Sequence, residues 1–126
     1  MRRRQVLLVE DDDSMRELIR LTLEPLRLNL SEAANVSEAW TLLETQRPDT
    51  VLVDVNLERL RDGLELCRQI KQSIELGDTR VIVISTASQL EDIERGRAAG
   101  ADLYIVKPFS PAHLLAVIGA HRLLQS

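Results

Sequence analysis

Short apolar runs rich in valine, isoleucine and leucine alternate along this chain with longer stretches of helical periodicity. The apolar runs predict strands at residues 5–9, 28–33, 50–54, 80–85 and 102–106. Strands that alternate with helices form a parallel sheet, and right-handed crossovers cover both of its faces with helices. We therefore predict a doubly wound α/β fold with five parallel strands and five helices. Strand 28–33 is more polar than the others, so we expect it at an edge of the sheet.

Capping signals predict where the helices begin and end. The residues expected to cap helix N-termini are all serines: Ser14, Ser37, Ser88 and Ser110. Glu17 and Glu91 stand three residues after two of these serines, as in a capping box, and Pro111 follows the last of them. Gly100 stands where a left-handed C-cap belongs, and Pro25 marks the end of the first helix. The third helix is expected over residues 63–74.

Length and composition indicate one soluble domain. With 126 residues the chain can build one core but not two, so residues 1–126 are expected to form a single domain. The net charge of −4 does not indicate a nucleic-acid-binding surface. The run VLLV near the N-terminus is too short for a signal-peptide core or a membrane span. Cys67 stands alone in the sequence, so no internal disulfide is expected, and the cytoplasm is the expected compartment.

Polar residues follow four of the five predicted strands. They are Glu10, Asp11 and Asp12 after the first strand, Asp54 at the end of the third, Ser85 and Thr86 at the end of the fourth, and Lys107 after the fifth. The carboxyl ends of parallel strands meet at one edge of the sheet, where open α/β sheets bind their ligands. We therefore expect these side chains to converge in one crevice.

The residue types in this set indicate a phosphoryl-transfer site. Neighbouring carboxylates repel one another unless a cation lies among them, and Mg²⁺ prefers such hard oxygen ligands. A cation, the Lys107 ammonium and the Ser85 hydroxyl around Asp54 would suit a transferring phosphoryl group, with Asp54 as the nucleophile. Each residue also has an ordinary structural interpretation, since acidic runs are usually solvated loops and a lone lysine is usually a surface residue. The coincidence at four strand ends favours the site.

Several segments along the chain carry a resemblance to a known family. They are VLLVEDD, VLVDVNL, DG, VIVIST and AAGADLYIVKPF, together with the final helix. Over essentially its whole length the chain resembles the receiver domain of two-component response regulators. The resemblance implies a flavodoxin-like sheet with strand order 2-1-3-4-5 and a phosphoacceptor signalling function.

The resemblance also implies a role for each acidic residue. Asp54 corresponds to the phosphoacceptor, and it would join Glu10 and Asp11 in holding Mg²⁺, with Glu10 acting through water. The backbone carbonyl of Asn56 would complete the protein ligands. Asp12 lies outside this set, because Arg16 follows Glu10 at the six-residue spacing usual in the family.

A second group of residues corresponds to the switch of the family. Ser85 is the expected switch hydroxyl, with Thr86 giving a backbone N–H to the phosphoryl group; the 22-residue step to Lys107 favours this choice over Thr86 as the switch. Lys107 would pair with a phosphoryl oxygen, and its bond to Pro108 is expected to be cis. Tyr104 corresponds to the aromatic residue that moves between outward and inward positions.

The implied partners are a sensor histidine kinase or histidine phosphotransfer protein as donor and an effector protein or domain as recipient of the signal. The switching face would consist of the last two helices and the last strand, where a homodimer could also form. The sequence departs from the family in having Glu58 where a proline is usual and one extra residue between Asp54 and Gly63.

Three other functions compete with a signalling receiver. A Mg²⁺-dependent phosphohydrolase with an aspartate nucleophile would need a second aspartate two residues later as general acid, and Asn56 stands there. A flavin or nucleotide binder would need a glycine-rich phosphate loop after the first strand, where acids stand instead. A degenerate receiver could act only as a protein-binding module, although the acids, Ser85 and Lys107 are all retained.

Overall fold

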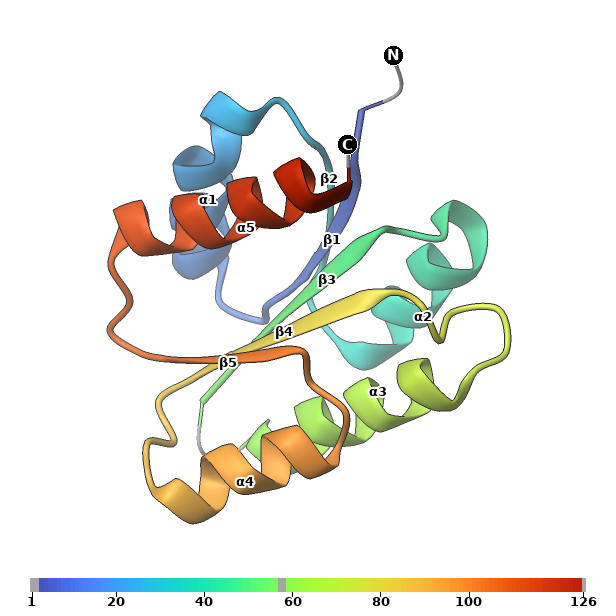
Figure 1. The fold of residues 1–126 in the computed structure, drawn as a ribbon, viewed down its shortest axis with the longest axis vertical. Coiled ribbons are helices and arrows are strands. Elements are labelled where there is room, and N and C mark those ends of the chain that lie inside the picture. Colours follow the sequence, from blue (N-terminus) through green and yellow to red (C-terminus); the bar gives the residue numbers. More distant parts are fainter. Residues whose placement is uncertain (1–2, 57–58, 126) are drawn as a thin grey trace.

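The computed structural model describes residues 3–56 and 59–125, with side chains as far as residue 119. In Figure 1 the strands form one layer between two layers of helices. Neighbouring strands are all parallel and follow the order β2-β1-β3-β4-β5. The strands are β1 (Gln5–Val9), β2 (Asn29–Ala33), β3 (Thr50–Val55), β4 (Arg80–Ser85) and β5 (Leu103–Val106). The predicted doubly wound α/β fold is confirmed, as is the edge position of the more polar strand.

Five helices cover the two faces of this sheet. They are α1 (Asp13–Leu23), α2 (Val36–Gln46), α3 (Leu60–Gln72), α4 (Leu90–Ala98) and α5 (Pro111–Gln125), with a 3₁₀ turn, η1 (Glu24–Leu26), after α1. None of the helices in the described part of the chain is long and apolar enough to cross a membrane. The third helix was predicted over residues 63–74. It begins three residues earlier, at Leu60, and ends at Gln72.

The sheet has a separate hydrophobic core on each face. Because successive side chains of a strand point to opposite faces, Leu7 joins the core beneath α2 and α3, whereas Leu8 joins the core beneath α1 and α5. Both leucines are at most 1% exposed, and a fully buried side chain of this size contributes roughly 1.5–3 kcal/mol. The two cores hold the strand register, because a shift by one residue would exchange the side chains between them.

The serine caps predicted for the first two helices are wrong. Asp12, not Ser14, caps α1 and accepts a 2.9 Å bond from the amide three residues on. Asn35, not Ser37, caps α2 in the same way at 2.8 Å. Aspartate and asparagine are caps as good as serine, and their earlier positions let each helix begin sooner. Ser110 does cap α5, as predicted, with a 3.3 Å bond from the amide of the third residue after it.

At α4 the predicted capping box is wrong by one residue. The box consists of Gln89 and Asp92, not Ser88 and Glu91, and Asp92 Oδ2 accepts the Gln89 N–H at 3.2 Å. Asp92 is 8% exposed, so its carboxylate is fixed toward the helix start while the neighbouring glutamate stays in solvent. The C-terminal prediction is confirmed, since Gly100 adopts φ 97° beyond the end of α4.

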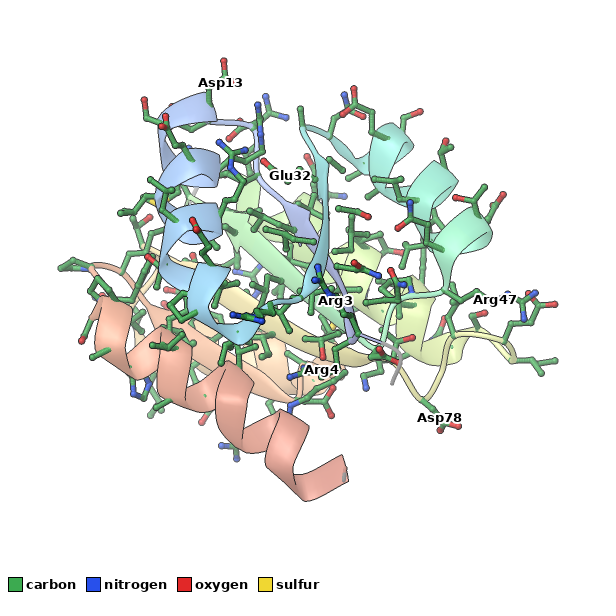
Figure 2. The ribbon with its side chains drawn as sticks, turned by 90° about the horizontal axis from the view of Figure 1, so that it is seen from above. Arg3, Arg4, Asp13, Glu32, Arg47 and Asp78 are labelled. Atoms are coloured by element: carbon green, nitrogen blue, oxygen red, sulfur yellow. The ribbon has the colours of Figure 1, made fainter. Side chains whose placement is uncertain are left out.

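Two groups of side-chain contacts attach helices to the sheet at the edge where its strands begin. The Arg4 guanidinium, labelled in Figure 2, donates to the Thr50 hydroxyl and to the Ile118 carbonyl of α5, at 2.8 Å in each case. The Lys71 ammonium of α3 lies 2.7 Å from the Asp102 carboxylate and donates a 2.8 Å bond to the carbonyl of the residue before β4. Helices on both faces are thereby attached to the sheet far from the carboxyl ends of its strands.

Candidate functional site

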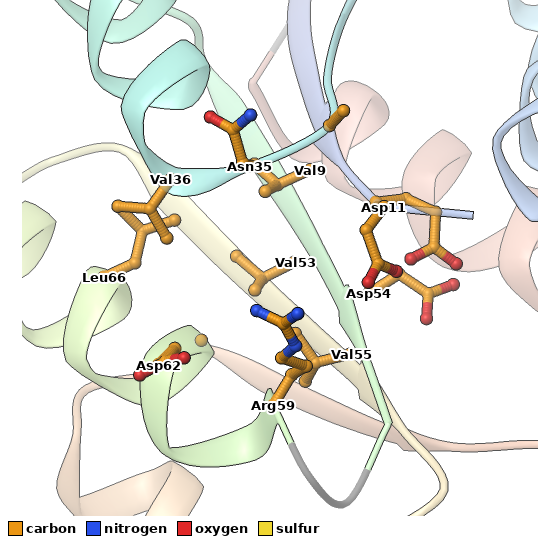
Figure 3. A pocket seen from close by; sticks show the side chains of 13 residues that line it. Val9, Asp11, Asn35, Val36, Val53, Asp54, Val55, Arg59, Asp62 and Leu66 are labelled. Carbon is orange, nitrogen blue, oxygen red and sulfur yellow. The ribbon is translucent and has the colours of Figure 1, made fainter. Parts of the chain in front are cut away.

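The predicted convergence of polar residues occurs at the carboxyl edge of the sheet. Glu10 follows β1, Asp54 lies near the end of β3, and both line one pocket together with Asp11 and Arg59. Figure 3 shows the Asp11 and Asp54 carboxylates close together, whereas Arg59 lies on the other side of β3. The parallel register puts these strand ends side by side, so residues far apart in the sequence share one site.

Asp54 is a buried carboxylate with a cationic partner. Its exposed fraction is 2%, and the Lys107 ammonium forms an ion pair with its Oδ1 atom. Burial raises the pKa of Asp54, and the charge of Lys107 opposes that rise. Its Oδ2 atom is buried and accepts no hydrogen bond from any described group. Buried oxygens without a donor are unfavourable, and an oxygen of this kind can accept a bond from a cation or another ligand.

Glu10 is held almost out of solvent beside the negative charge of Asp54. Its exposed fraction is 4%. Burial first, and the charge of Asp54 second, raise the pKa of Glu10 to about 8. Asp11, next to it, is exposed to solvent. The accumulated negative charge therefore favours a proton or another cation at this edge of the sheet.

The donor set fits a magnesium ion better than a metal that needs an all-protein cage. Among the side chains that the structure describes, no group of three or more from histidine, cysteine, aspartate and glutamate could hold a metal ion. Mg²⁺ does not need such a group, because it keeps several waters and binds through one or two carboxylates. The unpartnered Asp54 oxygen and the exposed Asp11 carboxylate are ligands of that kind.

The loop after β3 brings the Asn56 carbonyl to the start of α3. This oxygen accepts a 3.1 Å bond from the Arg59 N–H, and the Asn56 side-chain oxygen accepts from the same N–H at 3.0 Å. A carbonyl has a second lone pair, so the predicted metal contact of Asn56 stays a prediction. Glu58, at the departure from the family pattern, lies outside the described residues.

Ser85 and Tyr104 meet at one residue, Ala87. The fully buried Ser85 Oγ accepts the Ala87 N–H at 3.0 Å, and the Tyr104 hydroxyl donates to the Ala87 carbonyl at 2.7 Å. The ring of Tyr104 is half-buried and packs against the core beneath α3, and we call this arrangement its inward position. Thr86 lies between these contacts and is exposed.

Lys107 is fixed by the strand pairing as well as by Asp54. Its backbone N–H donates a 2.7 Å bond to the Ser85 carbonyl, which joins the ends of β4 and β5. The Lys107–Pro108 peptide bond is cis, as predicted.

Two contacts near the acids were not predicted from the sequence. The Arg16 guanidinium donates a 2.9 Å bond to the Glu10 carbonyl, although the sequence analysis used Arg16 only to align the acids. The Asp12 carboxylate caps α1, which takes it away from the acid pair. An aspartate directly before a helical pattern is a capping signal that could have been recognised.

Comparison with known proteins places this geometry in a family. The profile of the response regulator receiver domain matches residues 6–119. The chain belongs to the response regulator receiver domain family. Among sequence relatives of this receiver domain, response regulator MprA of Mycolicibacterium vanbaalenii is 37% identical over 112 residues, which are 89% of this chain and 47% of MprA. The receiver domain thus spans about half the length of the curated relatives it matches.

Solved structures give the same answer for the receiver fold. A putative response regulator from Chloroflexus aurantiacus superimposes with a TM-score of 0.85 at 27% identity, over 94% of this chain and 97% of that one. The response regulator DrrB of Thermotoga maritima, an OmpR/PhoB homologue, has a TM-score of 0.81 at 28% identity and covers 99% of this chain and 55% of its own.

Proposed function

We propose that this receiver domain accepts a phosphoryl group on Asp54 in a Mg²⁺-dependent reaction and later loses it to water. The observation that carries the proposal is the buried Asp54 carboxylate, paired with Lys107 and lining one pocket with Glu10 and Asp11. A buried carboxylate with one unpartnered oxygen is unfavourable for stability, and this arrangement makes sense as a prepared nucleophile.

The residues of the chain have distinct parts in this reaction. An Asp54 oxygen attacks phosphorus, the bond to the donor breaks, and an acyl phosphate forms. The Lys107 ammonium balances the charge of a phosphoryl oxygen, while the Ser85 hydroxyl and the Thr86 N–H donate to the others. Asp11 and Asp54 would hold Mg²⁺ together with the Asn56 carbonyl, and Glu10 would act through water. The bound ion would supply further neutralisation of phosphoryl charge.

The phosphorylated state would act through the inward Tyr104 ring. Phosphorylation adds charge and acceptor oxygens next to Ser85, and a hydroxyl drawn toward them changes the space beside Ala87. The face of α4, β5 and α5 would then favour one of two pre-existing arrangements. The donor would be a sensor histidine kinase or a histidine phosphotransfer protein, and an effector or a second copy of the domain would bind this face.

Phosphorylation can be tested directly by intact mass spectrometry. The protein is treated with acetyl phosphate and Mg²⁺, and we expect one added phosphoryl group that Asp54→Asn abolishes and EDTA prevents. Asp12→Asn is the matched control, because it removes one nearby carboxylate but keeps a good helix cap. A folded protein that gains no phosphoryl group from this donor would contradict the proposal and support the alternative function, a degenerate receiver that acts only as a protein-binding module. Repeated turnover of phosphate esters would instead support the phosphohydrolase.

A further inference from the structure

The inward ring of Tyr104 lies directly against a glycine in α4. A Cβ atom built on Gly96 would lie 2.6 Å from Tyr104 Cδ2 and 3.1 Å from Cε2. Carbon atoms in favourable contact are about 3.5–4.0 Å apart, so an alanine and this ring cannot both keep their places. The ring therefore occupies space that every other residue type at position 96 would claim.

The other end of the ring is also fixed. The Tyr104 hydroxyl donates its 2.7 Å bond to the Ala87 carbonyl, so the ring cannot slide along the helix without losing that bond. A Cβ on Gly96 would meet Leu64 only at 3.8 Å, an ordinary contact. The conflict is thus confined to the Tyr104 ring, which a rotation about its own side-chain bonds would relieve.

Glycine is otherwise a poor choice at this position. Gly96 lies within the nine-residue α4 and is buried, and a glycine inside a helix is less favourable than an alanine. Figure 1 shows α4 running beside β5, the strand that carries Tyr104. The close approach of the ring explains why a residue without a side chain stands there.

We propose that Gly96 admits Tyr104 to its inward position, so that the residue at position 96 sets how the ring divides between inward and outward positions. The inference rests on the proposed function in one respect only: the ring position is read as the state of the switch. A side chain at position 96 would hold the ring outward whether or not Asp54 is phosphorylated. It would thereby separate the phosphorylation chemistry from the response of the α4-β5-α5 face.

The sequence offers a direct probe, because Tyr104 is its one tyrosine. In protein labelled with 3-fluorotyrosine, the ¹⁹F resonance reports this ring alone. The shift of the resonance between H₂O and D₂O measures how far the ring is exposed. We expect a small solvent shift in the unmodified protein and a clearly larger one, with a displaced resonance, in Gly96→Ala.

Gly119→Ala is the matched control for this substitution. It makes the same change within α5, where a Cβ would meet Leu26 Cδ2 at an ordinary 3.7 Å. The tyrosine resonance of this variant should stay at the unmodified position. A Gly96→Ala resonance with the unmodified shift and solvent response would overturn the proposal.

A double variant covers the case in which Gly96→Ala lowers stability too far to be studied. Adding Tyr104→Ala removes the ring, so in that background Gly96→Ala should raise the thermal midpoint, as expected for a glycine replaced within a helix. If the double variant is no more stable than Tyr104→Ala alone, the ring is not the obstacle and the proposal is wrong.

Phosphorylation by acetyl phosphate distinguishes a failure of this proposal from a failure of the proposed function. Gly96→Ala should still gain one phosphoryl group, because Gly96 does not line the acidic pocket. Failure of phosphorylation in the unmodified protein would contradict the proposed function while leaving the difference between the two unphosphorylated resonances intact. Normal phosphorylation together with an unmoved Gly96→Ala resonance would contradict only the role of Gly96.

Discussion

The pair formed by Asp54 and Lys107 links stability to chemistry within two residues. Asp54 is buried, and the side chain of Lys107 is only 13% exposed. Removing one member of such a pair leaves the other charge without compensation, which costs more than removing both. The site is therefore expected to tolerate paired changes better than single ones.

Lys107→Met should accordingly lower the free energy of unfolding by about 2 kcal/mol in Mg²⁺-free buffer, because the Asp54 carboxylate loses its partner. Denaturant unfolding measures the change. Adding Asp54→Asn to this variant should recover most of the loss. Simple additivity of the two substitutions would show that the pair has no such coupling.

Burial lowers the reactivity of the Cys67 thiol in the folded protein. Its thiol is fully buried, and burial raises its pKa to about 11 from 9.0. At pH 8 a disulfide reagent should modify the unfolded chain quickly and the folded chain only as fast as it opens. Modification of the folded protein at the rate of a free thiol would contradict the burial.

The same shift affects stability at alkaline pH. Between pH 9 and 11 the unfolded thiol loses its proton while the folded one keeps it, so the stabilisation present below pH 9 is lost as pH rises. The unfolding free energy of the unmodified protein should therefore fall more steeply in this window than that of Cys67→Ala, as denaturant titrations at fixed pH would show.

Single residues also show where sequence reasoning reached its limit. The strand-end positions of Glu10, Asp54 and Lys107 follow from apolar runs and parallel topology, so they could be predicted. The contact of Gly96 with Tyr104 could not, because it joins a helix to a strand through packing that no local pattern encodes. A glycine within a helical pattern is the one sequence signal that indicates such a contact.

At the scale of elements, the β1–α1 connection positions the acids. Arg16 of α1 donates to the Glu10 carbonyl at 2.9 Å and lies 3.5 Å from Glu32 of β2. The guanidinium thereby ties α1 and β2 to the peptide that carries the acidic pair. Its positive charge alone would disfavour a bound cation, so position and charge have opposite effects on Mg²⁺ affinity.

Arg16→Gln tests which effect is larger. We expect Mg²⁺ to bind roughly 2- to 10-fold more weakly, as the loss of about one net hydrogen bond implies. Isothermal titration calorimetry measures the affinity, and Arg20→Gln is the control, since Arg20 also pairs with Glu32 but makes no bond to Glu10. Tighter binding by Arg16→Gln than by Arg20→Gln would mean that charge dominates.

The element boundaries reveal a second limit of prediction. Strands β1 and β4 begin and end where their apolar runs do, because burial on both faces leaves a continuous signal. The helix starts were less certain, since Asp12 and Asn35 compete with nearby serines as caps and the sequence does not say which backbone amide faces them. The strand order was implied by the family resemblance and not by the pattern of the runs.

For the whole molecule, metal binding should appear as resistance to unfolding. A ligand that binds only the folded state stabilises it according to its concentration relative to Kd, by about 1.4 kcal/mol at ten times Kd. We expect Mg²⁺ to raise the unfolding free energy by about this amount, while NaCl at matched ionic strength does much less. Denaturant curves with and without Mg²⁺ measure the difference, which Asp11→Asn should abolish. Equal stabilisation of Asp11→Asn would place the ion elsewhere.

The ties made by Arg4 and Lys71 lie at one end of the sheet, and the acids lie at the other. Part of the stability of the fold is thus provided at the opposite ends of the strands from the acidic residues. Substitutions at the end of the sheet that holds the Arg4 and Lys71 contacts are therefore expected to change thermal stability with little effect on the chemistry of the acidic residues. Conversely, substitutions near the acids are expected to change the lifetime of a phosphoryl group while the contacts at the other end of the sheet keep the fold stable.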